Sequence, residues 1–248
     1  MTEPTVASCL VVGTGLIGTS IALALRRAGV QVHLADRDPQ SVRTAAGLGA
    51  GTAEPPPRQV DLAVVAVTPA ATAEVVTGLI AGNVAATVVD TASVKAPVCR
   101  DVQAAVGAAP HFVATHPMAG RERSGPAAAR GDLFQGRPWV ITRGDADEGA
   151  LARARALVRL CGATPVELDA AAHDAAVALV SHLPQVAASL VAARLVDGPA
   201  EALALTGQGL RDVTRIAASD ADLWVEILEG NAEPVARLLA ELRQDVDA

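Results

Sequence analysis

The stretch SCLVVGTGLIGTSIALALRRAG, residues 8–29, decides the fold. Its apolar residues 8–13 are typical of a buried strand, and the periodicity of residues 16–29 is typical of a helix. Three glycines in this stretch follow the order G-x-G-x-x-G: Gly13, Gly15 and Gly18. This spacing permits a tight turn, the approach of a pyrophosphate to the backbone, and close packing of helix on strand. The stretch therefore predicts the beginning of a dinucleotide-binding domain.

An acidic residue follows the next apolar run. Residues 30–36 indicate a second strand, which ends at Asp36. A carboxylate at this place holds the hydroxyls of the adenosine ribose and repels a 2′-phosphate, so NAD is the predicted cofactor. Arg37 beside it leaves NADP open as an alternative. The predicted cofactor-binding residues are Gly13, Gly15, Leu16, Ile17, Gly18, Asp36, Arg37, Val67 and Thr68.

Short apolar runs alternate with helical patterns through the first two thirds of the chain. Further strands are predicted at 61–67, 86–92, 111–116 and 138–142, with helices near 70–81, 95–106 and 148–161. This alternation predicts an α/β fold with a mostly parallel sheet that helices cover on both faces. We assign residues 1–168 to this Rossmann-type domain.

The remaining residues, 169–248, predict an all-α second domain. Residues 171–197 form a long helical run that is apolar nearly all round. Such a helix must be buried in more than one direction, and the domain offers few other helices to cover it. We therefore predict a homodimer formed through the helical domain.

The composition excludes several classes of function. The chain has 248 residues, of which 20 are basic and 27 acidic, and it has no basic stripe, so nucleic-acid binding is not expected. Its three cysteines, Cys9, Cys99 and Cys161, are too scattered for a disulfide framework or a zinc site, and no metal is predicted. The N-terminus lacks a cationic start, and no uninterrupted apolar run reaches the ~18 residues of a membrane span. We expect a cytoplasmic protein without a membrane partner.

Polar side chains follow two of the predicted strands. Ser93 and Lys95, the single lysine of the chain, come after the strand at 86–92 and are predicted to face the nicotinamide side of the cleft. The alternative is that Ser93 caps the following helix and Lys95 is solvated. His116 ends the next parallel strand and precedes Pro117. A neutral imidazole at the mouth of a nucleotide site is a candidate general base.

The helical domain carries a polar stripe of its own, made of His182, Gln185 and Ser189. Pro184 should kink this helix. Buried polar groups need partners, so the stripe predicts a ligand or an arginine contact, with an interhelical network as the alternative. Arg211 and Arg215, one helical turn apart, could bind carboxylates bidentately, although exposed arginines are common.

Together these motifs resemble the prephenate and arogenate dehydrogenase family of tyrosine biosynthesis. The resemblance runs from about residue 9 to about residue 240 and is carried, beside the glycine motif, by SVK (93–95), THPMAGRERSG (115–125), HD (173–174), SHLP (181–184), LRDVTRIA (210–217) and Trp224. It implies an NAD(P)-dependent oxidative decarboxylation, in which a hydride leaves C4 of a cyclohexadienol for nicotinamide while the ring carboxylate departs as CO2.

The resemblance also implies a role for each residue that matches. His116 takes the proton of the C4 hydroxyl, and Ser93 hydrogen-bonds the same hydroxyl. Arg215 anchors a substrate carboxylate, with Arg211 as a cation nearby. The remaining matches are a cleft histidine (His182), a gating acid of the loop (Glu122), and a residue near the partner subunit's site (Trp224).

Several substrates and functions stay open at this point. Gln185 is neutral where an acid could pair with the ammonium of arogenate, which favours prephenate as the substrate. Arogenate, and a prephenate analogue with an amine in place of the C4 hydroxyl, are the alternatives. A β-hydroxyacid or imine-reducing dehydrogenase and a non-enzymatic NAD-binding sensor have the same predicted architecture.

Overall fold

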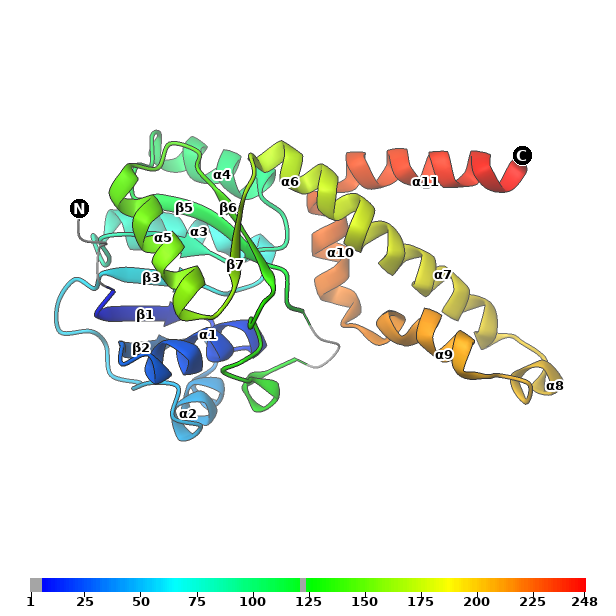
Figure 1. The fold of residues 1–248 in the computed structure, drawn as a ribbon, viewed down its shortest axis with the longest axis horizontal. Coiled ribbons are helices and arrows are strands. Elements are labelled where there is room, and N and C mark those ends of the chain that lie inside the picture. The colour runs from blue at the N-terminus through cyan, green and yellow to red at the C-terminus, as the bar shows by residue number, and fades with distance from the viewer. Residues whose placement is uncertain (1–5, 121–123) are drawn as a thin grey trace. The chain divides into compact units, whose positions relative to one another are not determined.

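The computed structural model describes residues 6–120 and 124–248. The chain divides into two compact units, Met1–His173 and Asp174–Ala248, each with its own fold (Figure 1). The division falls inside helix α6 (Ala170–Val177).

Unit 1 is built on one seven-stranded sheet in the order β2-β1-β3-β4-β5-β6-β7. Its strands are β1 (Ser8–Val12), β2 (Gln31–Ala35), β3 (Leu62–Val65), β4 (Val88–Asp90), β5 (Phe112–Pro117), β6 (Pro138–Thr142) and β7 (Thr164–Glu167). Strands β1 to β5 run parallel, β6 pairs antiparallel with β5, and β7 runs parallel to β6. The prediction of a mostly parallel Rossmann-type sheet is confirmed, with β7 added at the edge.

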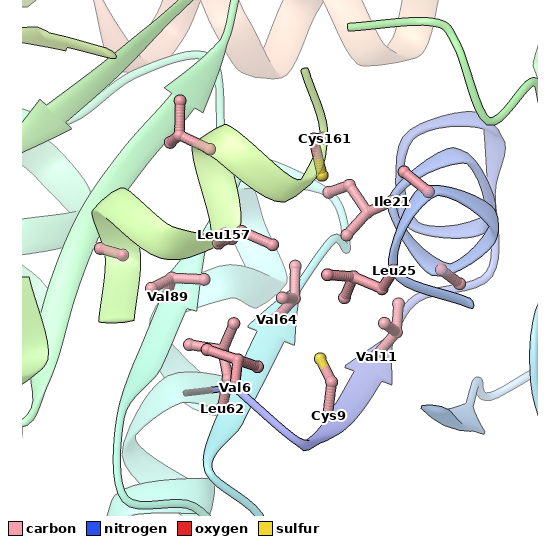
Figure 2. Close-up of a cluster of buried hydrophobic side chains, with 14 of the residues drawn as sticks. Val6, Cys9, Val11, Ile21, Leu25, Leu62, Val64, Val89, Leu157 and Cys161 are labelled. Atoms are coloured by element: carbon pink, nitrogen blue, oxygen red, sulfur yellow. The ribbon is translucent and has the colours of Figure 1, made fainter. Parts of the chain in front are cut away.

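Helices cover both faces of this sheet (Figure 1). They are α1 (Leu16–Arg27), α2 (Pro39–Gly47), α3 (Pro69–Ala81), α4 (Ala96–Val106) and α5 (Glu148–Leu160), with a short 3-10 turn at Pro126–Ala128. Side chains alternate along each strand, so Val11 packs in the cluster with α1 and α5 whereas Leu10 packs in the cluster with α3 and α4. Figure 2 shows the first cluster, where Ile21 of α1 lies close to Leu157 of α5. Burial on both faces explains why the strands are continuous apolar runs.

The cysteines contribute to this packing. Cys9 and Cys161 are buried in the first cluster (Figure 2), and Cys99 is half-buried in α4. Burial raises the pKa of both buried thiols, to about 12 for Cys161, so neither is ionised near neutral pH. These two cysteines therefore act as small apolar side chains.

Helix α2 was not predicted from the sequence. The side chain of Asp38 accepts hydrogen bonds from the backbone N–H groups of Gln40 (3.0 Å) and Ser41 (3.1 Å) and so caps the helix. Pro39 occupies the first helical position, where its missing N–H costs nothing. The Asp-Pro pair is therefore a signal in the sequence for the start of this helix.

Unit 2 is entirely helical, as predicted. It continues from α6 through a π-helical turn (Ala178–His182) into α7 (Leu183–Val196), followed by α8 (Ala200–Leu203), α9 (Gln208–Thr214), a 3-10 turn (Arg215–Ala218), α10 (Ala221–Gly230) and α11 (Ala232–Asp247). The π-helical turn ends two residues before Pro184, whose ring nitrogen has no N–H to donate to the preceding turn. The predicted kink is thus absorbed as a locally widened helix.

The helical run Ala170–Val196 is long and apolar enough to cross a membrane by length and composition, with a mean hydropathy of 1.6. Only 28% of its most apolar window is buried, and large apolar side chains such as Leu179, Val180 and Leu190 are exposed. Buried polar side chains, among them His182, lie along the same run.

The backbone pairing between β4 and β5 ends at Val89 and Val113. Past this point a buried ion pair connects the two strands. The Asp90 carboxylate and the Lys95 ammonium are both fully buried and form a salt bridge. Asp90 Oδ1 accepts from the Thr115 N–H (2.9 Å), and Lys95 Nζ donates to the Thr115 carbonyl (2.7 Å). Side-chain bonds thus replace the strand ladder at this point.

The prediction that Lys95 binds substrate is wrong, because its buried ammonium is already bonded to the Asp90 carboxylate and the Thr115 carbonyl. The solvated alternative is equally wrong. A buried carboxylate is costly unless a cation pairs with it, and Lys95, five residues after Asp90, supplies that cation. The single lysine is therefore a structural element of unit 1.

We expect Lys95→Met to destabilise unit 1 strongly, because it leaves Asp90 as an unpaired buried charge. Such losses are about 3–5 kcal/mol, which lowers the melting temperature of a domain this size by on the order of 10 °C. Arg100→Met is the matched control, since Arg100 is exposed and its contact with Asp101 is long (3.6 Å). Calorimetry of both variants checks this, and equal melting temperatures would contradict the role of the buried pair.

Candidate functional site

The glycine loop after β1 has the shape that a dinucleotide requires. Gly13 has φ +97°, and a Cβ there would lie 2.3 Å from the Ala66 carbonyl oxygen. A Cβ at Gly18 would lie 1.9 Å from the Gly13 oxygen, whereas a Cβ at Gly15 would meet no atom within 4 Å. Packing therefore requires the first and third glycines, and the second borders open space at the N-terminus of α1, where a pyrophosphate fits.

Asp36 lies beside this loop at the carboxyl end of β2. Its Oδ2 accepts from the Thr14 N–H (2.6 Å) and the Thr14 hydroxyl (3.0 Å), and its Oδ1 accepts from the Asp38 N–H (2.9 Å). These bonds hold the half-buried carboxylate in place before any ligand arrives. Thr14 was not among the predicted residues, although its position within the glycine motif was a signal.

The other predicted cofactor residues surround the same loop. Leu16 is buried and Ile17 half-buried at the start of α1, and Arg37 is exposed after Asp36. Val67 and Thr68 follow β3, which pairs with β1. Strands β2 and β3 lie on opposite sides of β1, so the chain reverses direction across the sheet here, the usual place for a bound nucleotide. Contact of each side chain with the cofactor stays a prediction.

His116 lies near the carboxyl end of β5 and is almost fully buried, with 8% of its surface exposed. Its Nδ1 lies 2.9 Å from Nε2 of His173, a fully buried residue of α6, and the two rings meet edge to face. The main chain of the preceding residue, Thr115, is held by Asp90 and Lys95, and the indole N–H of Trp139 donates to the Thr115 hydroxyl (2.9 Å). Both the backbone and the ring of His116 are therefore fixed.

Ser93 lies half-buried in the segment between β4 and α4. The N-cap position of α4 belongs to Lys95, so the alternative that Ser93 caps this helix is wrong. Because β4 and β5 are parallel neighbours, Ser93 and His116 lie at the same edge of the sheet. Glu122, the predicted gating acid, lies outside the described residues.

Unit 2 contains a second oriented histidine, His182, which is 1% exposed. The Asn231 amide nitrogen donates to the Asp174 carbonyl (2.8 Å) and contacts His182 Nδ1 (3.0 Å). Since a carbonyl only accepts, the amide orientation is fixed, and His182 Nδ1 must accept as well. The proton of neutral His182 is therefore on Nε2. Trp224 packs edge to face against this ring, with centroids 5.9 Å apart.

Gln185 is buried one turn after His182. Its amide nitrogen donates to the Ile216 carbonyl (3.0 Å) and lies 3.5 Å from the Ser189 hydroxyl. Gln185 therefore takes part in an interhelical network, which is the alternative predicted for this stripe.

The two predicted carboxylate-binding arginines lie close to this network in the chain. Arg215 precedes Ile216, so the network also fixes the backbone next to this exposed arginine. Arg211 is exposed on α9. The carboxylate-binding roles of both arginines stay predictions, as does a ligand contact for Trp224.

Comparison with known proteins places both units in one family. Residues 21–167 match the nucleotide-binding domain of prephenate dehydrogenase, and residues 169–248 match the dimerization domain of prephenate dehydrogenase. The chain is 46% identical over 241 residues to the probable prephenate dehydrogenase NovF of Streptomyces niveus, covering 96% of this chain and 67% of that protein.

Solved structures agree with this match. Prephenate dehydrogenase from A. aeolicus, in complex with hydroxyphenyl propionate and NAD+, is 27% identical with a TM-score of 0.87, covering 99% of this chain and 90% of that one. Synechocystis arogenate dehydrogenase is 25% identical with a TM-score of 0.79, covering 97% and 89%. With matches over almost its whole length, the chain belongs to the prephenate dehydrogenase family.

Proposed function

We propose that this chain catalyses the NAD-dependent oxidative decarboxylation of prephenate to 4-hydroxyphenylpyruvate, with CO2 and NADH as the other products. The observation that carries the proposal is the oriented His116 at the carboxyl edge of a nucleotide-binding sheet, in a chain of the prephenate dehydrogenase family. The A. aeolicus relative was solved with NAD+ and hydroxyphenyl propionate, which shares a hydroxyphenyl ring and a carboxylate with the proposed product.

His116 acts as the base in this reaction. Its Nδ1 faces His173, so Nε2 is the nitrogen that receives the C4 hydroxyl proton. Ser93, at the same sheet edge, hydrogen-bonds the same hydroxyl. Bound NAD+ supplies the hydride acceptor. As the ring carboxylate leaves as CO2 the ring becomes aromatic, and the proton returns from His116 to the phenolic oxygen, so the reaction releases no net proton.

Asp36 sets the choice of cofactor. The Thr14 bonds keep its carboxylate at the end of β2, where it can accept from the ribose hydroxyls and repels a 2′-phosphate. We therefore expect NAD to be used in preference to NADP, although the exposed Arg37 lies next to it.

Unit 2 supplies the groups that bind the substrate. Arg215 and Arg211 are exposed cations that can hold a carboxylate bidentately. His182, with its proton on Nε2, offers a donor, and Trp224 packs on its ring. Glu122, which lies outside the described residues, keeps its proposed role as a gate.

The dimerization-domain match supports a homodimer, and we place its interface along the apolar face of α7. Twelve of the exposed large apolar side chains belong to unit 2, among them Leu179, Val180, Leu190, Val191 and Val196. A second copy of the chain would remove them from water. It would also cover the apolar helix without lipid, in keeping with a cytoplasmic enzyme.

Arogenate is the second candidate substrate, because of the way Gln185 is bonded. Its amide nitrogen faces the Ile216 carbonyl and the Ser189 hydroxyl, so Oε1, an acceptor, is the atom that it can offer to a ligand. A hydrogen-bond acceptor suits the ammonium group of arogenate, whereas the lack of charge on the Gln185 amide favours prephenate.

Initial rates of NADH formation with prephenate and with arogenate, each with NAD and with NADP, test the proposed reaction. We expect turnover of prephenate with NAD, and a fall in kcat of about 10²–10⁴-fold in His116→Asn, because the base is lost. Binding of NAD to this variant, measured by calorimetry, should be unchanged. Turnover of neither substrate, or undiminished turnover in the variant, would contradict the proposal.

Arg215→Ala should mainly raise the KM for prephenate, by about 10²-fold, because a charged hydrogen-bond partner of a substrate carboxylate is lost. Arg243→Ala is a control, since it removes an exposed arginine of α11 that has no proposed role in binding. Steady-state kinetics of both variants check this. An unaltered KM in Arg215→Ala would remove that residue from the substrate site.

Leu190→Glu should convert the dimer into monomers, because it places a charge in the proposed apolar interface. Leu48→Glu is the matched control, since Leu48 is similarly exposed (48% against 57%) but lies after α2 in unit 1. Sedimentation velocity of the two variants and the unmodified chain distinguishes them. A monomeric unmodified chain, or dimers of the same strength in both variants, would refute this interface.

A further inference from the structure

The contact between His116 and His173 joins two elements of unit 1. His116 comes from β5 and His173 from the first turns of α6, and their nitrogens Nδ1 and Nε2 are 2.9 Å apart. The carboxylate of Asp169 caps α6 by accepting from the Ala172 N–H (2.8 Å), and its carbonyl accepts from the His173 N–H (2.9 Å). The place of His173 is therefore set by the start of the helix.

Burial gives this contact its chemical consequence. His173 is 0% exposed and His116 is 8% exposed, so water does not compete freely for the bond. Two imidazole nitrogens at hydrogen-bond distance need one proton between them, with one ring as donor and the other as acceptor. A neutral pair therefore has two arrangements, and the two differ in which nitrogen of His116 carries the proton.

Only one of these arrangements is compatible with His116 as a base. If His173 donates to Nδ1, the proton of neutral His116 is on Nε2, and the nitrogen that must receive the substrate proton is already occupied. If His116 donates from Nδ1, its Nε2 is unprotonated and can act as the base. His173 must then accept through Nε2 and carry its own proton on Nδ1.

We propose that His173 is a positioning residue that holds His116 in the Nδ1–H tautomer and accepts a hydrogen bond from the imidazolium that forms during turnover. The inference rests on the proposed function, since it assigns His173 a task within that reaction. It gives the base an orienting partner, as nucleophile and base pairs commonly have a third group behind the base. Here the third group is a neutral imidazole instead of a carboxylate.

Two substitutions at His173 distinguish the effect of its hydrogen-bond acceptor from the effect of its side-chain volume. His173→Leu removes the acceptor, whereas His173→Gln offers an amide oxygen in a similar place. We expect kcat to fall about 10- to 100-fold in the leucine variant, the usual cost of losing a partner that orients a histidine, and to recover largely in the glutamine variant. The KM for prephenate and the affinity for NAD should stay unchanged in both. Equal losses of kcat in the two variants would overturn the proposal.

A matched control and a double variant show whether a loss of kcat comes only from a disturbed fold. His33→Leu also removes a buried histidine of unit 1, one whose Nδ1 contacts the Glu54 carbonyl (2.8 Å), and it should leave kcat unchanged. In a His116→Asn background, His173→Leu should cause no further loss of activity, because the two residues act as one unit. Additive losses would overturn the proposal.

The tautomer of His116 can be measured without turnover, by nitrogen NMR of the chain with labelled histidine. The sequence has five histidines, and the signals of His116 are those missing from His116→Asn. We expect Nδ1–H in the unmodified chain and in His173→Gln, and a shift toward Nε2–H in His173→Leu. Should the leucine variant not fold, an Nε2–H signal from His116 in the unmodified chain would by itself overturn the proposal. Because this measurement needs no substrate, it tests the tautomer of His116 even if neither prephenate nor arogenate is turned over.

Discussion

The buried carboxylate of Asp90 is the constraint on which the candidate site depends. A charge at the end of β4 is tolerable only with a cation and hydrogen-bond donors around it, and these come from Lys95 and Thr115. Because Lys95 bonds the Asp90 carboxylate, the chain forms a turn between β4 and α4. Ser93 lies in this turn, at the edge of the sheet. The ion pair also locks the main chain immediately before His116. One buried ion pair thus holds the backbone near both residues that we propose to contact the reacting hydroxyl, Ser93 and His116.

Both units orient an imidazole with a neutral partner. In unit 1 the partner of His116 is another histidine, and in unit 2 the partner of His182 is the amide of Asn231. The amide cannot reverse without turning its nitrogen away from the Asp174 carbonyl, so the proton of neutral His182 stays on Nε2. Each unit thus orients its histidine through a hydrogen-bond partner that is itself uncharged.

The sequence was sufficient where local rules decide the structure. The glycine loop, the apolar strands buried on both faces, and His116 at a strand end all follow from periodicity and position. It was insufficient where a partner is distant or buried. The pairing of Lys95 depends on its folding back onto Asp90, and His173, 57 residues from His116, stands in a helix whose apolar composition gave no sign of the contact. A hydrogen bond between two distant elements depends on tertiary packing, so the spacing of residues in the sequence does not predict it.

A neutral partner for His116 also suits the proton balance of the proposed reaction. The base must return its proton to the phenolic oxygen as the ring becomes aromatic. A phenolate oxygen is ordinarily a stronger base than an imidazole nitrogen, so this return is downhill. A carboxylate behind the base would stabilise the imidazolium and reduce that gradient. In the proposed arrangement His173 accepts from the Nδ1–H of His116 while stabilising the charge less than a carboxylate would, and so it leaves the proton free to return.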